Sequence, residues 1–181
     1  DREHEAMFYR KAAKLKKLVQ EKLWDREAGF FKVYPLKSRE TDVADWDFSK
    51  IDAEKYVCEE IGFLPWLFEL PDAGYERAWR YLRSEQGFEA PYGPTTAGRG
   101  HKNFMAEHPE HECLWNGPSW PFATTQTLHA LANVLKDYQQ DYVTKQDFDI
   151  LFSRYTHSHY RADENGKRIN WLDENLDPFT G

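Results

Sequence analysis

The chain has 181 residues, enough for one core that buries about 70% of the surface exposed by the unfolded form. Its 31 acidic and 24 basic residues give a net charge of −7, which argues against a nucleic-acid partner, because phosphates require a basic face. No window approaches the ~18 consecutive apolar residues of a membrane span, and the two cysteines, Cys58 and Cys113, form no disulfide framework.

The first elements are predicted from periodicity and turn residues. Residues 2–24 predict an amphipathic helix, with an apolar face that includes Phe8, Leu15 and Val19. Gly29 is placed to end it in a left-handed turn, and residues 30–34 predict a short strand. The next stretch, 37–53, carries many charges and few periodic apolar positions, which indicates a loop.

The middle of the chain is more apolar and then rich in turn residues. Residues 56–70 predict a short buried helix with irregular ends, because Gly62 and Pro65 interrupt an aromatic run. A further helix is expected to begin at Pro71-Asp72. Residues 86–109 form a long segment rich in Gly, Pro and Thr, and its aromatic content predicts an ordered, functional loop rather than disorder.

One stretch, residues 113–133, organises the chain. Gly117-Pro118 predicts a stiff turn, Ser119 is the expected N-cap, and a helix with Phe122 and Leu128 on its apolar face runs to about residue 138. Trp115, Asn116 and Trp120 lie within six residues beside this helix start, which suits a polar ring with apolar faces, such as a sugar. Each tryptophan taken alone is better explained as core filler, and only the pair together with the C-terminal stretch favours a sugar site.

The last third predicts a helix and a hairpin. Thr144 opens the helix with Asp147 in the capping-box position, and Asn165-Gly166 marks a tight hairpin turn. The chain ends with an acidic segment that contains Trp171 and Glu174. Helices alternate with long loops that carry the chemistry-bearing residues, an order that describes paired helices stacked around an axis with their loops at one end.

Several of these motifs resemble one family in its own order. The sequence Trp-Asn-Gly-Pro-Ser-Trp at 115–120 resembles the Trp-x-Gly-Pro-x-Trp element of (α/α)6-barrel glycoside hydrolases of the mannosylglycerate hydrolase and family 63 processing α-glucosidase type, more distantly trehalases. The terminal Glu-Asn-Leu-Asp-Pro-Phe-Thr-Gly at 174–181 resembles their Glu-x-x-x-Pro-x-Thr-Gly element. Similar loop elements are Leu-Trp-Asp-Arg-Glu-Ala-Gly-Phe-Phe at 23–31, Ile-Gly-Phe-Leu-Pro-Trp-Leu-Phe at 61–68 and Ala-Pro-Tyr-Gly-Pro-Thr-Thr at 90–96.

The resemblance implies an all-α fold with minor β, a single domain over residues 1–181 that forms part of an (α/α)6 toroid of six helical hairpins. It implies an inverting glycosidase for an α-linked oligosaccharide or glycoside, with Glu174 as the general base. The family's general-acid aspartate is expected upstream of Asp1 and its last hairpins after Gly181, so the chain is expected to be a fragment. Leu176 departs from the tyrosine of many relatives.

The predicted site therefore combines one carboxylate with aromatic walls. Inversion requires an acid and a base whose carboxyls are roughly 6.5–9.5 Å apart. Glu174 is the expected base, although acidic neighbours also allow a solvated loop residue. Asp45 and Asp47 offer a second carboxylate within the chain, but a charged surface loop explains them adequately. The expected sugar-contacting residues are Trp66, Tyr92, Trp115, Asn116, Trp120 and Gln126.

The sequence predicts neither a metal nor another cofactor. His101, His108, His111 and Cys113, and likewise the pair His157 and His159, lack zinc-site spacing with a clear fourth ligand. As a piece of a ring, the chain is expected to be inactive or nearly so and to self-associate through apolar hairpin surface.

Two rival functions remain open at this stage. A sugar epimerase on the same scaffold would place His101, His157 or His159 in the groove as an acid/base. A non-catalytic carbohydrate-binding or interaction domain would keep the tryptophan walls but need no carboxylate aimed at a cavity.

Overall fold

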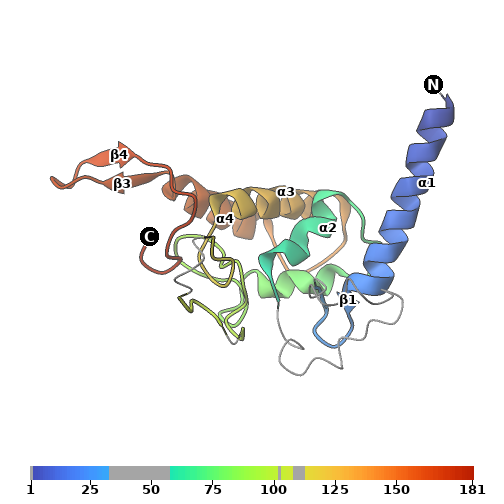
Figure 1. The fold of residues 1–181 in the computed structure, drawn as a ribbon, viewed down its shortest axis with the longest axis horizontal. Coiled ribbons are helices and arrows are strands. Elements are labelled where there is room, and N and C mark those ends of the chain that lie inside the picture. Colours follow the sequence, from blue (N-terminus) through green and yellow to red (C-terminus); the bar gives the residue numbers. More distant parts are fainter. Residues whose placement is uncertain (1, 33–57, 102, 108–112) are drawn as a thin grey trace.

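The computed structural model describes residues 2–32, 58–101, 103–107 and 113–181, and within them the chain is mostly helical, as predicted (Figure 1). The predicted loop at 37–53, with Asp45 and Asp47, and the residues His108 and His111 lie outside this described part. In chain order the elements are α1 (Arg2–Leu18), η1 (Val19–Leu23), β1 (Trp24–Asp25), β2 (Phe30–Phe31), η5 (Glu60–Phe63), α2 (Leu64–Leu67), η6 (Glu76–Tyr81), α3 (Pro121–Asp137), α4 (Lys145–His157), β3 (Tyr160–Ala162) and β4 (Arg168–Asn170).

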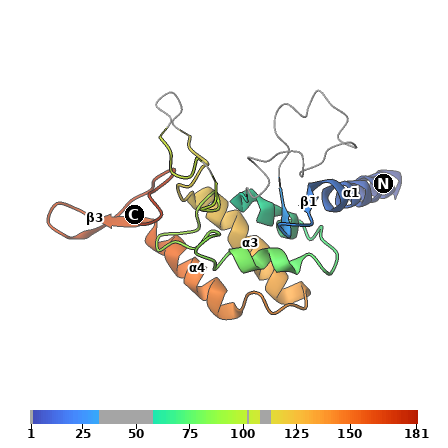
Figure 2. The ribbon, with the colours of Figure 1, turned by 90° about the horizontal axis from the view of Figure 1, so that it is seen from below.

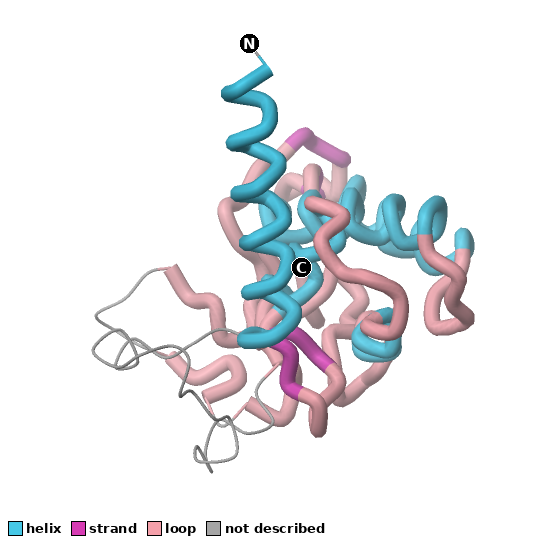
Figure 3. Tube along the Cα trace, turned by 90° about the vertical axis from the view of Figure 1, so that its right-hand side faces the viewer, coloured by secondary structure: helices cyan, strands magenta, loops and turns pink. Residues whose placement is uncertain are grey.

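The helix α1 projects from the rest of the molecule, as Figures 1 and 3 show. None of its residues from Arg2 to Leu18 is buried, and Phe8 and Leu15 of the predicted apolar face are 63% and 57% exposed. The chain meets the core just after α1, in the single π-helical turn η1, where Val19 and Leu23 pack against it. The predicted helix is confirmed, but its apolar face is covered only at Val19 and Leu23, which we call the foot of the helix, and not along its length.

The strands β1 and β2 form a short antiparallel hairpin behind this foot. Gly29 closes it in the left-handed region, with φ at +68°, and its N–H donates to the Asp25 carbonyl at 2.8 Å. The buried Asp25 carboxylate accepts from two backbone N–H groups of the turn and from Lys32 Nζ at 2.7 Å. Pairing the buried ammonium and carboxylate, with further hydrogen bonds, offsets the cost of removing them from water.

The core is built of aromatic rings beneath η5, α2 and η6. Trp66 and Trp79 are both fully buried, with their ring centroids 5.6 Å apart in an edge-to-face arrangement, and Phe63 stacks on Trp79 at 4.5 Å. Each such aromatic pair stabilises the fold by about 0.5–1.5 kcal/mol beyond the contribution from burying its apolar surface. The expectation that Trp66 is a wall of the sugar site is therefore corrected. Its ring is a core residue, because α2 turns it toward Phe31 and Trp79 rather than outward.

The segment after α2 also differs from expectation. The sequence predicts a helix from Pro71-Asp72, whereas the helical turns begin at Glu76 and are of the tighter 3₁₀ type. Gly74 has φ at +108°, and its N–H donates to Glu76 Oε2 at 2.7 Å, so the backbone makes a turn before any helix can start. Ala78 and Trp79 of these helical turns are buried.

The helices α3 and α4 are consecutive and pack side by side as a helical hairpin (Figure 2). Pro121 is the first residue of α3, and the residue before it, Trp120, makes no side-chain capping bond, so the predicted N-cap role of Ser119 is wrong. Leu128 is buried as predicted, but Phe122 is 64% exposed. The buried residues in the first turns of α3 are instead Pro121, Ala123 and Thr124.

The predicted cap of α4 is confirmed. The Asp147 N–H donates to the Thr144 side chain, and the Asp147 carboxylate accepts from the Thr144 N–H at 2.7 Å. Arg83 pairs with Asp147 at 3.0 Å and with Glu89 at 2.6 Å, and Arg154 of α4 also pairs with Glu89, at 2.7 Å. This charge network ties Glu89, in the described part of the predicted loop, to residues near the start and the end of α4.

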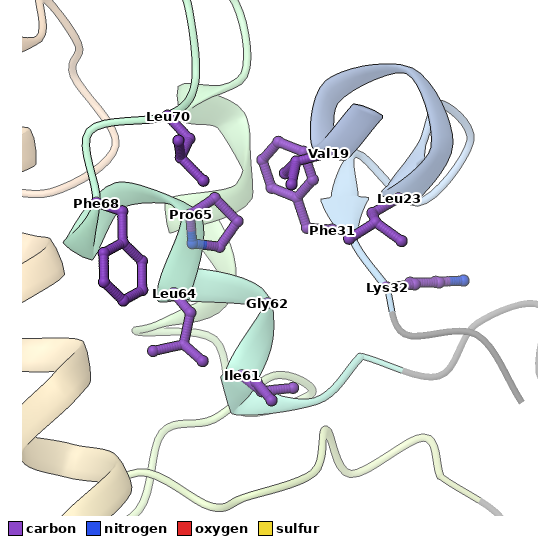
Figure 4. A pocket seen from close by; sticks show the side chains of 10 residues that line it. All are labelled: Val19, Leu23, Phe31, Lys32, Ile61, Gly62, Leu64, Pro65, Phe68 and Leu70. Atoms are coloured by element: carbon purple, nitrogen blue, oxygen red, sulfur yellow. The ribbon is translucent and has the colours of Figure 1, made fainter. Parts of the chain in front are cut away.

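An apolar hollow of about 230 Å³ opens between the foot of α1 and α2 (Figure 4). Its walls are almost entirely carbon, so it has no set of polar groups to orient a sugar. It is lined by Val19, Leu23, Phe31, Lys32, Ile61, Gly62, Leu64, Pro65, Phe68 and Leu70. In the described part of the chain, no helix has the length and apolar character needed to cross a membrane.

Candidate functional site

Two distant segments of the chain are joined by a single antiparallel bridge between Ser119 and Leu176. The Ser119 N–H donates to the Leu176 carbonyl, and the Leu176 N–H donates to the Ser119 carbonyl, each at 2.9 Å. Ser119 belongs to residues 115–120, the loop before α3 that carries Trp115 and Trp120 and that we call the tryptophan loop. Leu176 lies two residues after Glu174. The bridge fixes the terminal acidic segment against the tryptophan loop, and two of the motifs singled out in the sequence meet at one place.

An open hollow of about 500 Å³ lies beside this bridge. Its walls come from the tryptophan loop, the start of α3, the end of α4 and the segment after β4. It contains both predicted tryptophans and the predicted base. The lining residues are Trp115, Trp120, Pro121, Phe122, Thr125, Tyr155, His159, Leu172, Asp173 and Glu174.

The two tryptophans have different roles in this wall. Their rings stack with centroids 4.5 Å apart and planes 24° apart. Trp115 is 43% exposed, whereas Trp120 is 5% exposed and its Nε1 donates to the Leu114 carbonyl at 2.8 Å. Trp115 therefore presents the open aromatic surface, and Trp120 supports it from behind.

Glu174 and its neighbour Asp173 are the carboxylates among the described residues of this hollow. Asp173 Oδ2 accepts from Arg161 Nη2 at 2.7 Å and is committed to that ion pair. Glu174 is exposed, so its carboxylate can reach both water and a molecule in the hollow. Of the two, Glu174 is the one without an ion pair to Arg161.

His159 lies in the same hollow, next to Tyr155. Its Nδ1 is 2.7 Å from the Tyr155 carbonyl, and because a carbonyl only accepts, this nitrogen carries a proton. In the neutral ring the other nitrogen, Nε2, is then an acceptor. His157 lies instead in a second hollow, described below, and its Nδ1 contacts the Ser153 carbonyl at 2.7 Å.

The tryptophan loop is held by glycines and by threonine. Gly93 and Gly117 have φ at +138° and +152°, and a Cβ on Gly93 would lie 2.4 Å from Ser119 Oγ. Thr96 Oγ1 donates to the Pro118 carbonyl at 2.8 Å and accepts from the Gly117 N–H at 3.1 Å. The loop around residue 95 therefore fits directly against the tryptophan loop. A side chain at Gly93 would collide with Ser119, and one at Gly117 would collide with Met105.

Asn116 serves this loop rather than the hollow. Its Nδ2 donates to the carbonyls of Asn103 and Ala106 at 2.7 and 2.9 Å, and its backbone carbonyl accepts from Met105. Asn116 is not among the residues that line the hollow with Glu174, and its amide hydrogens are engaged by the 103–106 turn, so its expected contact with sugar hydroxyls stays a prediction. Gln126 is half-buried in α3 and is not among the residues lining the hollow with Glu174.

Tyr92 is exposed, as a sugar-contacting residue must be, but it faces a different hollow. Its N–H donates to the Pro178 carbonyl at 3.0 Å.

The sequence did not indicate that Phe122, Leu172 and Tyr155 line the hollow that contains Glu174. The sequence predicts Phe122 on the apolar face of α3. Its position directly after Pro121, in the first turn of the helix, is the signal that it could instead face the loops.

A buried carboxyl, that of Glu60, connects the elements that carry the site. Glu60 at the start of η5 is fully buried, and this burial raises the pKa of its carboxyl to about 8. Thr127 Oγ1 of α3 donates to Glu60 Oε1 at 2.8 Å, and the Glu60 N–H donates to the Thr96 carbonyl at 2.9 Å. Glu60 thus joins η5, α3 and the loop that carries Thr96. Among the described residues, no group of three or more His, Cys, Asp or Glu could hold a metal ion.

The geometry can be compared with known proteins. The family model of the mannosylglycerate hydrolase MGH1-like glycoside hydrolase domain matches residues 1–181, the whole chain. The chain belongs to the MGH1-like glycoside hydrolase family. The predicted resemblance is confirmed by this match.

One solved structure similar to this MGH1-like chain is described as a sialidase. It is 35% identical, superposes with a TM-score of 0.78, and the match covers 97% of this chain. The present chain spans 14% of the length of that protein. No curated protein matches the chain. Family membership and the backbone match agree on a glycoside hydrolase domain.

Proposed function

We propose that this MGH1-like chain carries the general base and part of the sugar site of an inverting glycoside hydrolase, with Glu174 as the base. The observation that carries the proposal is the placement of Glu174 in one hollow with the stacked pair Trp115 and Trp120. The open face of Trp115 suits the C–H face of a pyranose ring. Glu174 suits activation of the water that attacks the anomeric carbon. The substrate class is an α-linked oligosaccharide or glycoside.

The second carboxylate of the mechanism belongs elsewhere in the enzyme. In the described part of this hollow, Asp173 is the other carboxylate, and its Oδ2 is paired with Arg161. The ionised carboxylate satisfies this pair with the guanidinium, so we do not assign Asp173 as the acid. We propose that the general acid lies outside this chain, in a larger (α/α)6 toroid, and that the chain alone has no measurable activity on glycosides with poor leaving groups.

Hydrolysis of a glycosyl fluoride tests the general base independently of the general acid, because fluoride leaves without being protonated. The experiment incubates the protein with α-D-glucosyl fluoride or α-D-mannosyl fluoride and follows the product by proton NMR. We expect slow release of the β-anomer, its loss in Glu174→Gln, and its retention in the matched control Glu164→Gln, since Glu164 is exposed in the distal hairpin. Equal rates in wild type and Glu174→Gln would refute the assignment. Turnover of ordinary glycosides that Glu174→Gln abolishes would instead refute an external acid.

A second candidate function is sugar epimerisation, favoured by the position of His159 in the same hollow. An epimerase removes and returns a proton at carbon, and its rate has a bell-shaped pH profile near neutrality when histidine is the acid/base. Deuterium uptake from heavy water into free mannose or glucose, lost in His159→Asn, would favour this candidate. A non-catalytic binding module would show neither deuterium uptake nor fluoride hydrolysis, and Glu174→Gln would leave its sugar binding unchanged.

We further propose that the chain self-associates, with a second copy as the occupant of the apolar surface at α1. The exposed Phe8 and Leu15 continue into the foot of the helix, where Val19 and Leu23 line the apolar hollow of Figure 4. A helix face and a hollow of the same apolar character on one molecule are self-complementary, as a two-fold dimer requires.

A further inference from the structure

A second hollow lies on the other side of the segment that carries Glu174. It has a volume of about 470 Å³, close to that of the first, but its walls mix polar and aromatic groups. They come from the β3–β4 hairpin, the end of α4, Tyr92 and the end of the chain. Asp173 lines both hollows, so the two are neighbours across one strand-like segment of the backbone.

Two aromatic rings offer open surface in this second hollow. Tyr92 is 39% exposed and Trp171 is 42% exposed. The guanidinium of Arg161 covers one face of the Trp171 ring, 3.7 Å from its centroid, so a ligand can contact only the uncovered part of the ring; Arg161 also pairs with Asp173 at 2.7 Å. Because a carboxylate balances the guanidinium, the hollow is suited to a neutral ligand rather than to an anion.

The polar groups of this hollow match the hydroxyls of a sugar. Arg161 supplies N–H donors, Asp173 supplies carboxylate acceptors, and the Asn175 amide supplies both. Vicinal hydroxyls donate and accept at once, so an exposed ion pair with a nearby amide can bind them without leaving a charge uncompensated. An aromatic wall with a few convergent polar groups is the usual composition of a ligand pocket.

The walls are held in place by backbone bonds. The Trp171 N–H donates to the His159 carbonyl at 3.0 Å, and the Tyr92 N–H donates to the Pro178 carbonyl at 3.0 Å. Asp177 Oδ1 accepts from the N–H groups of Phe179 and Thr180 at 2.8 and 3.0 Å, which fixes the turn after Pro178. Both aromatic walls are therefore anchored before any ligand arrives.

From this arrangement we infer that the second hollow is an additional sugar subsite, with Trp171 as its stacking wall, and that the substrate is an oligosaccharide spanning the segment at Asp173 rather than a small glycoside. The inference rests on the proposed function, because it takes the Trp115 hollow as the first sugar site. It assigns to the β3–β4 hairpin and Arg161 a binding role that the base and the first hollow do not require.

The experiment compares short and long ligands by isothermal titration calorimetry on the protein. The probes are maltose with maltotetraose and α-1,2-mannobiose with its tetraose. In one of the two series the tetrasaccharide is expected to bind roughly 3- to 10-fold more tightly than the disaccharide, the effect of one aromatic contact. Trp171→Ala should abolish this difference and leave disaccharide binding unchanged. Tyr142→Ala, at an exposed aromatic position in the α3–α4 connection, is the matched control and should retain it.

The outcomes distinguish the two proposals. If Trp171→Ala leaves tetrasaccharide binding intact while Trp115→Ala weakens both ligands, the second subsite is refuted and the proposed function stands. If no saccharide binds, or neither tryptophan affects binding, both are refuted. Trp171→Phe keeps an aromatic wall and should retain most of the length dependence, and circular dichroism of each variant checks that the fold is unchanged.

Discussion

Ser119 and Leu176 exchange both of their backbone hydrogen bonds, at 2.9 Å each, and this one bridge brings Glu174 to the tryptophan loop. Pairing of this kind depends on backbone groups and not on side-chain identity. The bridge therefore does not depend on which side chain residue 176 carries. Leu176 is itself nearly buried, at 9% exposure.

Replacement of Leu176 by proline tests this bridge. Proline lacks the N–H that donates to the Ser119 carbonyl, so Leu176→Pro should separate Glu174 from Trp115 and weaken sugar binding at least tenfold, beyond the ~1 kcal/mol of one lost hydrogen bond. Leu176→Ala, which keeps the N–H, is the control. Calorimetric binding and thermal unfolding are measured for both. Equal binding losses in the two variants would show that the side chain and not the bridge matters.

The stacked tryptophans should respond differently to truncation. Trp115→Ala removes an exposed ring and should lower sugar affinity roughly tenfold with little change in unfolding free energy. Trp120→Ala removes a buried ring and should destabilise the fold by about 3 kcal/mol. Urea unfolding and sugar titration of the two variants measure these effects. The same stability loss in both would contradict the division of roles between an open wall and its support.

Stability should fall with rising pH because of Glu60. The pKa of its carboxyl is about 8 in the folded protein against an ordinary value of 4.5, so the folded protein holds a proton that the unfolded chain releases between these values. This contribution is complete below pH 4.5 and decreases by on the order of 1 kcal/mol per pH unit up to about pH 8. Glu60→Gln retains an acceptor for the Thr127 hydroxyl and should flatten this dependence.

Urea unfolding at pH 5, 6.5 and 8 measures the effect of Glu60. Glu85→Gln, at an exposed position, is the control and should leave the slope as in the wild type. Parallel stability curves for wild type and Glu60→Gln would contradict a protonated Glu60 in the fold.

Sedimentation velocity tests the proposed self-association. The protein is expected to form dimers at micromolar concentration, and Leu15→Glu should shift them to monomers, because it places a charge on the exposed apolar face of α1. Ala13→Glu adds the same charge at another exposed position of the helix, about 160° around it from Leu15, and should leave the dimer intact. A monomer at all concentrations in the wild type would exclude the second copy as the occupant.

The sequence by itself determined the elements whose signals are local. The helix predicted over residues 2–24 and the capping box of Thr144 with Asp147 were predictable because periodicity and caps act within a few residues. Gly29 has the positive φ that was expected, but it closes the β1–β2 hairpin and does not cap the helix. The order of the motifs was also sufficient to indicate the glycoside hydrolase family, which the family model confirms.

The tertiary structure decided which aromatic residues are walls and which are core. Trp66 and Trp115 look alike as residues beside prolines and glycines, yet one is fully buried and the other is 43% exposed. Exposure depends on what distant segments pack against each ring: Phe31 and Trp79 cover Trp66, while Trp120 covers one face of Trp115. Glu174 and Trp115 line the same hollow because the bridge between Ser119 and Leu176 joins their segments. This bridge is a long-range backbone pairing that no local pattern encodes.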